Sequence, residues 1–353
     1  MKKGDETTIQ DIAKSAGVSK ATVSNVLNSK NTARPSTREK ILQVAEALHY
    51  HPKTMVGIPK YGDAERVIGI IVKELNYPFY TTIAEGATEY ANSRGYSLIV
   101  ASSDYNHERE KKFTRLFSAK GIKGTIIAPL IEGNSEIEHL LKLQMSKYPF
   151  VLLADVKNLS VNVVEIDNIK AIKKAVQYLI SNGHKRIVHF TGPPQSAHTK
   201  ERIDGFRNAF SEAPLAFAKE MIIPIGADKE GSYLRCIKYF KRKNRKDYPT
   251  AIVCFNDLQA LAVMTALQDL NIKVPDDISI IGNDDIHFTE TYSVPLTTIK
   301  SPQREIGQKA AEILIRNIES TTQLPIERIV LETELIIRKS TRKLTKSFKE
   351  ATK

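Results

Sequence analysis

The chain has 353 residues, of which 41% are hydrophobic and 26% charged, so we expect two or three folded units. Its apolar runs, such as Val67–Val72 and Ile278–Ile281, are far too short to span a membrane, and the charged first six residues lead into no secretory signal. Cys236 and Cys254 both lie in apolar stretches, which indicates buried thiols rather than a disulfide or a metal site. The composition therefore predicts a cytoplasmic protein.

The net charge of +12 is concentrated at the two ends of the chain. Residues 1–60 hold ten Lys or Arg against five Asp or Glu, and residues 341–353 hold five against one. Because each neutralised phosphate releases a counterion, basic ends around a nearly neutral body favour a polyanionic partner. An excess of charge that only keeps the protein soluble is the alternative. The basic run 241–246 is expected to be a solvated helix end and loop.

Residues 8–50 carry the signals of three short helices. Thr8-Ile9-Gln10-Asp11 has the spacing of an N-terminal capping box, and Ser19 is placed to cap a second helix. Ser36-Thr37-Arg38-Glu39 predicts another capping box that opens the third helix. Between the first two helices lies Gly17, which can adopt a positive φ in a tight turn. Two short helices across such a turn, followed by a packing helix, predict a helix-turn-helix domain.

A linker with two prolines and two glycines, residues 52–66, precedes a long α/β region. Strand signals occur at Val67–Val72, Ser97–Ala101, Thr125–Ala128, Phe150–Ala154, Arg186–Phe190, Met221–Ile225, Ala251–Phe255 and Ile278–Ile281. Helix signals occur at Phe79–Ser93, Glu108–Ala119, Ile137–Met145, Ala171–Ser181, Arg202–Ser211, Tyr233–Lys241, Asp257–Leu270 and Arg304–Ile318. This alternation predicts parallel sheets with helices on both faces. The region is too long for one sheet, so we expect two lobes, with a boundary near residues 155–165 and a return crossover near residues 296–301. Ligands bind such folds at the carboxyl ends of strands, which here means the cleft between the lobes.

The segment TIQDIAKSAGVSKATVSNVLN, residues 8–28, closely resembles the opening of the lactose-repressor (LacI/GalR) family of transcriptional regulators. The similarity continues through Leu48–Pro52, and blocks such as Asn182–Ile187 and Pro295–Ile299 resemble the family's sensor domain in their order. The resemblance implies a second domain like the periplasmic sugar-binding proteins. It also implies a homodimer that binds an operator in double-stranded DNA and answers to a small effector.

The resemblance places the second helix in the major groove, N-terminus first. Lys20 is then expected to donate to guanine, Ala21 to pack on a thymine methyl group, and Asn25 to pair with adenine. Short polar groups near helix ends suit phosphate oxygens and hold the register. These groups are Thr8, Ser19, Thr22 and Asn28. Thr8 and Ser19 are expected to act as helix caps as well, and the alternative for Ala21 is simple helix propensity.

The segment after this domain departs from the family. Relatives have a hinge helix whose leucine wedges into the minor groove, whereas this chain has Val56-Gly57-Ile58-Pro59. Gly57 weakens a helix, and Pro59 removes a backbone donor and disfavours helix in the residue before it. Met55 or Ile58 is the candidate for an apolar wedge. A plain flexible linker is the alternative.

A sugar-like effector requires ionised groups that recognise hydroxyls, together with an aromatic face. Asp155 and Asp257 each follow an apolar run, and Arg202 opens a helix with a guanidinium that can bind two ligand oxygens. The resemblance places Asp155, Arg202 and Asp257 at pocket positions of the family. The full set of candidates is Tyr77, Phe79, Tyr80, Asp155, Arg202, Asp257 and Asp284. The alternative for Phe79 and Tyr80 is that they belong to the hydrophobic core, because both lie at helical spacing.

We therefore predict a transcriptional regulator, and repression is expected on family grounds. Residues 1–51 form the DNA-binding domain, 52–66 the linker, 67–340 the two-lobed effector-binding and dimerisation domain, and 341–353 a basic tail. No cofactor or metal is expected. A sugar-processing α/β enzyme is one alternative, but the chain lacks a nucleophile elbow, a Walker loop and a Gly-x-Gly-x-x-Gly motif. An exported binding protein is opposed by the missing signal. Control of the regulator by a partner protein stays open.

Overall fold

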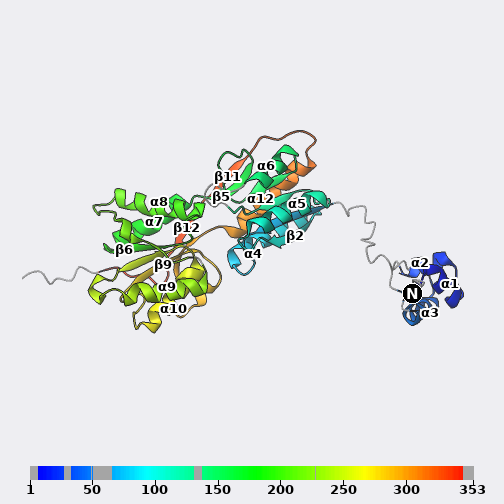
Figure 1. Ribbon diagram of the computed structural model, residues 1–353, viewed down its shortest axis with the longest axis horizontal. Coiled ribbons are helices and arrows are strands. Elements are labelled where there is room, and N and C mark those ends of the chain that lie inside the picture. Colours follow the sequence, from blue (N-terminus) through cyan, green and yellow to red (C-terminus); the bar gives the residue numbers. More distant parts are fainter. Residues whose placement is uncertain are drawn as a thin grey trace, which may run out of the picture. The chain divides into compact units, whose positions relative to one another are not determined.

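The computed structural model of the chain, drawn in Figure 1, describes residues 7–27, 33–48, 50, 66–130, 137–226 and 228–344. The chain divides into two units, Met1–Ala64 and Glu65–Lys353. Residues 52–65 of the expected linker lie outside the described residues. Across the described ranges, no helix has the length and apolar character needed to cross a membrane.

The first unit contains the three expected helices, α1 (Ile9–Ala16), α2 (Lys20–Leu27) and α3 (Pro35–Ala47). Thr8 and Asp11 form the predicted capping box at the start of α1. Gly17 ends α1 at a φ of 68°, a left-handed conformation that glycine adopts without steric cost. The helices pack through a small apolar core of Ile12, Ala13, Ala16, Val23, Val26, Ile41 and Ala45.

The capping box predicted at Ser36 is wrong. The third helix begins one residue earlier, at Pro35, after Arg34, and no side chain caps it. Proline suits the first helical position because its fixed φ is already helical and its missing N–H has no partner there. The proline therefore sets the start of α3, and Ser36 lies within its first turn.

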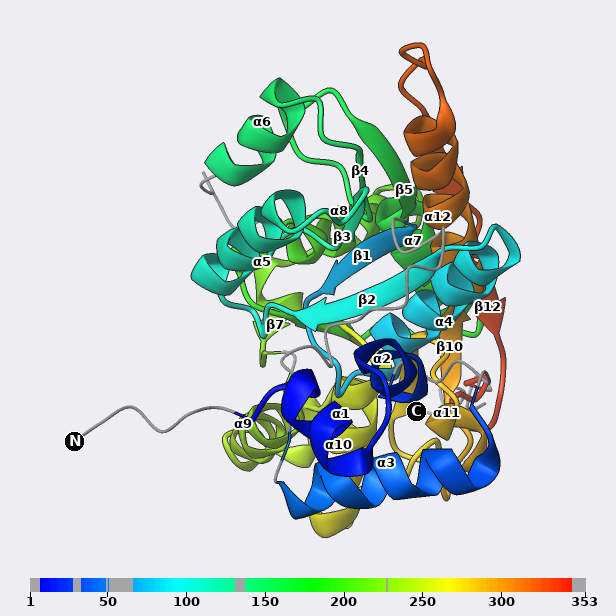
Figure 2. The same cartoon turned by 90° about the vertical axis from the view of Figure 1, so that its right-hand side faces the viewer.

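The larger unit has two lobes, and the described residues of each contain a six-stranded sheet. Lobe 1 consists of β1 (Val67–Val72), α4 (Pro78–Ser93), β2 (Ser97–Ser102), α5 (His107–Ala119), β3 (Thr125–Ile127), α6 (Glu138–Met145), β4 (Phe150–Leu152), β5 (Asn162–Ile166), α12 (Gln303–Glu319) and β11 (Arg328–Leu331). Its strand order is β11-β5-β4-β3-β1-β2, and neighbouring strands are parallel. Helices α4 and α12 pack on one face and α5 and α6 on the other (Figure 2).

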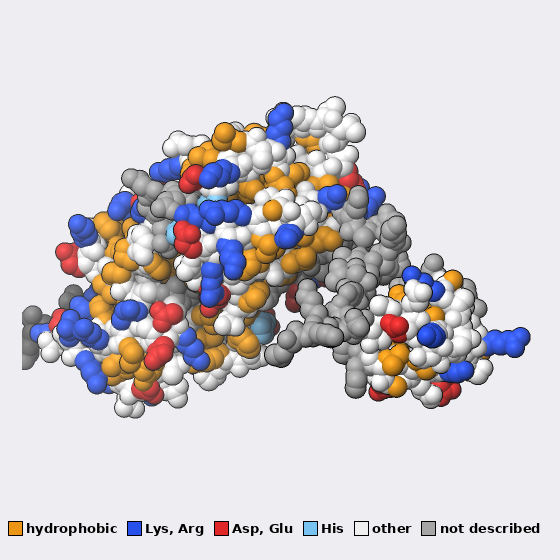
Figure 3. All heavy atoms as spheres, turned by 45° about the vertical axis from the view of Figure 1, so that its right-hand side comes forward, with side chains coloured by type: hydrophobic (Ala, Val, Ile, Leu, Met, Phe, Trp, Pro, Cys, Tyr) orange, Lys and Arg blue, Asp and Glu red, His pale blue; other side chains and the backbone are white. Residues whose placement is uncertain are grey.

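Lobe 2 repeats this plan. It consists of α7 (Asn168–Ser181), β6 (Ile187–Thr191), α8 (Ala197–Ser211), the 3-10 turn Lys219–Met221, β7 (Ile222–Pro224), α9 (Lys229–Lys241), the 3-10 turn Arg245–Asp247, β8 (Ala251–Cys254), α10 (Asp257–Asp269), β9 (Ser279–Asp284), α11 (Phe288–Thr291), β10 (Thr297–Lys300) and β12 (Glu334–Ile336). Its strand order is β12-β10-β9-β8-β6-β7, and β12 runs antiparallel to β10. Helices α9 and α10 cover one face of the sheet and α7 and α8 the other. On the face drawn in Figure 3, basic and acidic side chains are intermixed over both lobes of the larger unit.

Three segments connect the lobes. They follow β5 at residues 166–168, β10 at residues 300–303 and β11 at residues 331–334. The return crossover was predicted near residues 296–301, but most of this stretch forms strand β10. The chain passes from lobe 2 to lobe 1 directly after that strand. The sequence patterns did not indicate β5, β11 or β12. The first residues of the expected tail bond to lobe 2, where Leu344 N donates to Asn182 O at 2.8 Å.

Close helix packing within lobe 1 depends on Gly307. A methyl group at this position of α12 would overlap the carbonyl oxygen of Ile83 on α4. Glycine therefore allows the two helix backbones to approach.

Candidate ligand site and nucleic-acid interface

A cavity of about 900 Å³ lies between the two lobes of the larger unit. Lobe 1 contributes the aromatic side chains of Tyr77, Phe79 and Tyr80, and lobe 2 contributes Arg202 and Phe255 among others. The three lobe 1 rings pack on one another at 5.1–6.2 Å between centroids. The cavity thus combines an aromatic wall with charged groups, as small-molecule sites do.

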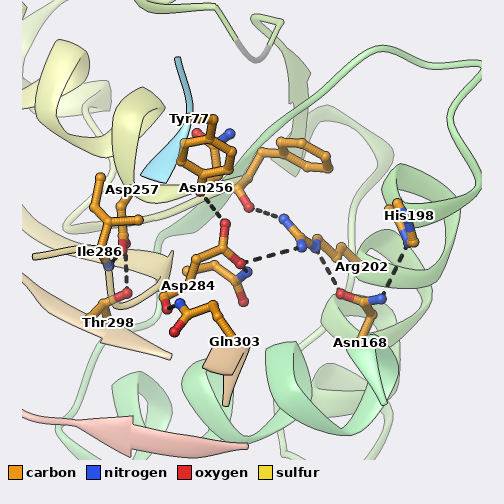
Figure 4. Close-up of polar contacts among 12 residues, drawn as sticks. Tyr77, Asn168, His198, Arg202, Asn256, Asp257, Asp284, Ile286, Thr298 and Gln303 are labelled. Atoms are coloured by element: carbon orange, nitrogen blue, oxygen red, sulfur yellow. Dashed lines mark hydrogen bonds and ion pairs between the residues drawn. The ribbon is translucent and has the colours of Figure 1, made fainter. Parts of the chain in front are cut away.

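Arg202 is held in place by Asn168, Phe255 and Asp284 (Figure 4). Its Nε donates to Asn168 Oδ1 at 3.1 Å, and its Nη1 donates to the carbonyl oxygen of Phe255. The guanidinium lies 4.4 Å above the Phe255 ring, and its Nη2 is 3.9 Å from Asp284 Oδ1. Because these contacts fix the plane of the fork, Arg202 can present its remaining donors to a ligand in one orientation.

Asp284 is the partner of Arg202 at the end of β9. Its carboxylate accepts from Tyr77 Oη and from Asn283 Nδ2, the latter at 2.6 Å. Burial raises the pKa of Asp284 to about 6, against the opposing effects of Arg202 and Tyr77. Burial also raises the pKa of the Tyr77 phenol well above its usual value, so the phenol keeps the proton that it donates. Arginine, carboxyl and phenol together offer both donors and acceptors to ligand hydroxyls.

Asp257 lies behind this cluster and does not line the cavity. It is fully buried, and its carboxylate accepts from Thr298 Oγ1 at 2.6 Å and from Ile286 N at 2.9 Å. Burial, and then the nearby Asp284, raise its pKa to about 7. The residue before it, Asn256, caps α10 and does line the cavity.

Asp155 does not line the cavity either. Its side chain is 40% exposed and pairs with Arg328 of β11 at 3.3 Å. Strand β4 ends at Leu152, so the chain has already turned when it reaches Asp155, and Ala154 takes the place at the cavity. Of the seven candidates, the structure brings together Tyr77, Phe79, Tyr80, Arg202 and Asp284.

Sequence patterns missed several lining residues. Asn168 follows β5 and positions Arg202, and its Nδ2 donates to Glu201 Oε2 at 2.9 Å. Lys73, directly after β1, and His198, in the first turn of α8, line the cavity from opposite lobes. The one sequence feature that could have indicated Lys73 as a lining residue is its position directly after a buried strand. His198 has no such signal.

The first unit presents α2 with an apolar side and a polar side. Val23 and Val26 are buried in its core, whereas Lys20 and Ala21 are exposed and Asn25 is partly exposed. The hydroxyl of Ser19 accepts from Thr22 N at 3.1 Å, as a helix cap does, and lies 2.8 Å from Thr22 Oγ1. Thr8 caps α1. The other expected contacts, Asn28, Met55 and Ile58, lie outside the described residues.

Residues 8–53 match the bacterial regulatory proteins of the lacI family, and residues 176–341 match the periplasmic binding protein-like domain. The chain is 34% identical over 340 residues to the HTH-type transcriptional repressor PurR of Vibrio parahaemolyticus, covering 96% of this chain and 99% of that protein. It belongs to the LacI family. A second member, the regulator DegA of Bacillus subtilis, is 32% identical over 337 residues, or 95% of this chain and 98% of that one.

Solved structures of LacI-family regulators share the fold. A complex of the transcriptional regulator CelR with cellobiose has a TM-score of 0.70 at 25% identity, covering 95% of this chain and 99% of that one. A LacI-family regulator from Enterococcus faecium with bound ribose has a TM-score of 0.69 at 25% identity, covering 79% and 100%. The predicted family and fold class are confirmed. The chain is a DNA-binding transcriptional regulator, and as its relatives are regulators, the alternative of an enzyme is excluded.

Proposed function

We propose that this LacI-family regulator is a repressor whose affinity for its operator changes when a sugar or a sugar derivative binds between the lobes of residues 67–340. The observation that carries the proposal is the buried cluster of Arg202, Asp284 and Tyr77 at a cavity large enough for such a ligand. Relatives solved with cellobiose and with ribose support this class of effector. The name of the PurR relatives supports repression.

The geometry suits a polyhydroxylated ring. Arg202 Nη2 lies 3.9 Å from Asp284 Oδ1, so adjacent hydroxyls of one ligand can bond to both groups. Phe79 and Tyr80 give an apolar surface for the face of the ring. In this proposal Asp155 takes no part, and Asp257 acts only by supporting the end of β9.

For the DNA side, we propose that residues 1–51 bind the operator and that residues 52–66 link them to the sensor. Lys20, Ala21 and Asn25 would contact base edges, because they lie on the face of α2 that its core leaves open. Thr8, Ser19, Thr22 and Asn28 would contact phosphates, and Met55 or Ile58 would supply the apolar wedge. As a homodimer, the protein would present two such units to two half-sites.

Effector binding is expected to change the angle between the lobes, since all three connections between them lie in short segments. A coupling free energy of about 1–3 kcal/mol is typical of such regulators and changes operator affinity about 5- to 150-fold.

The test uses Arg202→Gln, with Arg207→Gln as its matched control. Both residues lie on α8, but Arg207 is exposed and lies outside the cavity lining, where it pairs with Asp204 and lies 5.4 Å above the Phe217 ring. Ligands from a panel of sugars, sugar acids and sugar phosphates are screened by thermal shift. Operator affinity is then measured by fluorescence anisotropy with and without each ligand that binds. We expect the ligand response to be lost in Arg202→Gln and kept in Arg207→Gln. An unchanged response in Arg202→Gln would remove this residue from the site, and a panel that never changes operator affinity would overturn the proposed effector.

A further inference from the structure

The cavity between the lobes is lined by two arginine–aspartate pairs of the same construction. In the first pair, the Arg202 guanidinium donates to a backbone carbonyl oxygen and lies 3.9 Å from Asp284. In the second pair, Arg235 Nη1 donates to the carbonyl oxygen of Ile225 at 3.1 Å and lies 3.8 Å from Asp228 Oδ2. Each pair puts a positioned guanidinium beside a carboxylate, so each can bond to neighbouring hydroxyls of a ligand.

The two pairs lie at different ends of the cavity wall in lobe 2. Asp284 ends β9, whereas Arg235 is bonded to Ile225, which directly follows β7. The strand order places β8 and β6 between these two strands, so three strand spacings, about 14 Å, separate their carboxyl ends. A single sugar ring that bonds to Asp284 is too short to reach Asp228 as well.

The second pair lies at the open mouth of the cavity. All three connections between the lobes leave or enter one edge of each sheet, at β5 and β11 in lobe 1 and at β10 and β12 in lobe 2. Strands β2 and β7 form the opposite edges, so both end on the side of the cavity that no connection closes. The side chains of Arg235 and Asp228 are accordingly 54% and 66% exposed, against 9% and 4% for Arg202 and Asp284.

Lobe 1 supplies an aromatic ring at this mouth. Tyr105 follows β2, lines the cavity and is 50% exposed. Asp104 and Tyr105 have φ values of 47° and 54°, which are uncommon for residues other than glycine. Ser102 and Arg109 donate to the Asp104 carboxylate, and Tyr105 N donates to the carbonyl oxygen of Lys73 at 3.3 Å, so the turn is held in this form. Backbone strain that the surroundings enforce in this way is common at ligand sites.

We propose that the effector contains two joined sugar rings and that Tyr105, Arg235 and Asp228 bind the outer one. The inner ring bonds to Arg202 and Asp284. The outer ring lays its apolar face on the Tyr105 ring, and its hydroxyls bond to Arg235 and Asp228. This inference rests on the proposed effector site and narrows its ligand to disaccharides and longer saccharides. The cavity of about 900 Å³ is near the upper end of the range for small-molecule sites, about 300–1,000 Å³, and suits a ligand of this length.

The test compares disaccharides with the monosaccharides that compose them. Glucose is compared with maltose, cellobiose and trehalose, and glucose and galactose are compared with lactose and melibiose. Binding to the full-length protein is measured by calorimetry. Tyr105→Asn removes the ring but tolerates the left-handed backbone, Tyr105→Phe keeps the ring, and Arg235→Gln removes the outer charge. Arg242→Gln is the matched control, because Arg242 is an exposed arginine at the end of the same helix and does not line the cavity.

We expect a disaccharide to bind the wild type more tightly than its monosaccharides by about tenfold or more, since a stacked ring and further charge-assisted hydrogen bonds are added. Tyr105→Asn and Arg235→Gln should each weaken disaccharide binding by about tenfold. Both should leave monosaccharide binding unchanged, which also shows that the variants are folded. Tyr105→Phe should keep most of the difference, and Arg242→Gln should bind as wild type.

The outcomes separate this inference from the proposed function. Monosaccharides that bind as tightly as every disaccharide containing them would overturn the inference and leave the proposed function standing. A disaccharide that binds wild type, Tyr105→Asn and Arg235→Gln with one affinity would overturn it in the same way. If no sugar bound at all, the proposed effector would fall and the inference with it.

Discussion

Replacing Asp257 by Asn should make the larger unit more stable at alkaline pH. The carboxylate of Asp257 is fully buried and accepts from Thr298 Oγ1 and Ile286 N. Asparagine has nearly the same shape and keeps one oxygen acceptor. The Thr298 hydroxyl can rotate to accept from the new amide N–H. The substitution therefore removes the charge with little change in packing.

The magnitude follows from the raised pKa. Asp257 has an ordinary pKa of 3.8 and a pKa of about 7 in the folded protein, so the folded state holds the proton more tightly than the unfolded state. The free energy of unfolding therefore falls as the pH rises from about 4 to about 7. At about 1.4 kcal/mol for each pKa unit, ionisation of Asp257 costs the folded state about 4 kcal/mol above pH 7.

Calorimetric unfolding of the full-length wild type and of Asp257→Asn at several pH values between 4.5 and 8.5 measures this effect. The stability of the variant relative to wild type should rise across this range by about 3 kcal/mol, because about 1 kcal/mol of the effect has already developed at pH 4.5. Asp269→Asn, which changes an exposed carboxyl group at the end of the same helix, is the matched control. If the difference between Asp257→Asn and wild type stayed constant with pH, the reasoning about burial would be refuted.

Three further substitutions test the packing and the DNA contact. Gly307→Ala should lower the stability of the larger unit by about 3 kcal/mol in calorimetry, because the added methyl group overlaps the backbone of α4. Gly17→Ala should cost the first unit about 1 kcal/mol in the same measurement, because its φ of 68° disfavours alanine although the space around it is open. Lys20→Ala should reduce discrimination between operator and unrelated DNA by about 1–3 kcal/mol in anisotropy titrations. A loss that is equal on all DNA sequences would contradict a base contact for Lys20.

Much of the fold was predictable, because helix and strand periodicity, caps and turns act over short stretches of sequence. Buried strands such as β1, which is covered on both faces, read as continuous apolar runs. Strands β11 and β12 were missed since they are short, lie at sheet edges and are partly exposed, which breaks the apolar pattern. At the third helix, two competing local signals were present, and Pro35 outweighed the Ser36 box.

The site was predictable to the extent that its residues end strands or begin helices. Asp284 ends β9 and lines the cavity. Arg202 also lines the cavity, but the prediction that it opens a helix is wrong, because α8 begins at Ala197 and Arg202 lies in its second turn. Asp155 and Asp257 occupy similar positions in the chain, but local sequence does not determine which way a side chain turns after a strand ends. Their partners, Arg328 and Thr298, lie more than 40 residues away. That Lys73 and His198 line one cavity from different lobes depends on the tertiary fold alone.

The backbone of Asp284 connects the proposed ligand contact to the segments between the lobes. Its φ is 115°, a region that favours glycine, and strain of this kind typically costs about 1–3 kcal/mol. Its carbonyl oxygen accepts from the Gln303 side chain, just where the chain enters lobe 1 from β10. Two residues later, Ile286 packs into the core of lobe 1 while its N–H bonds to Asp257 of lobe 2. A ligand that binds the Asp284 carboxylate therefore acts on a residue whose backbone already holds the connection between the lobes. No long chain of intermediate contacts is needed for the effector to change how the two lobes are held together.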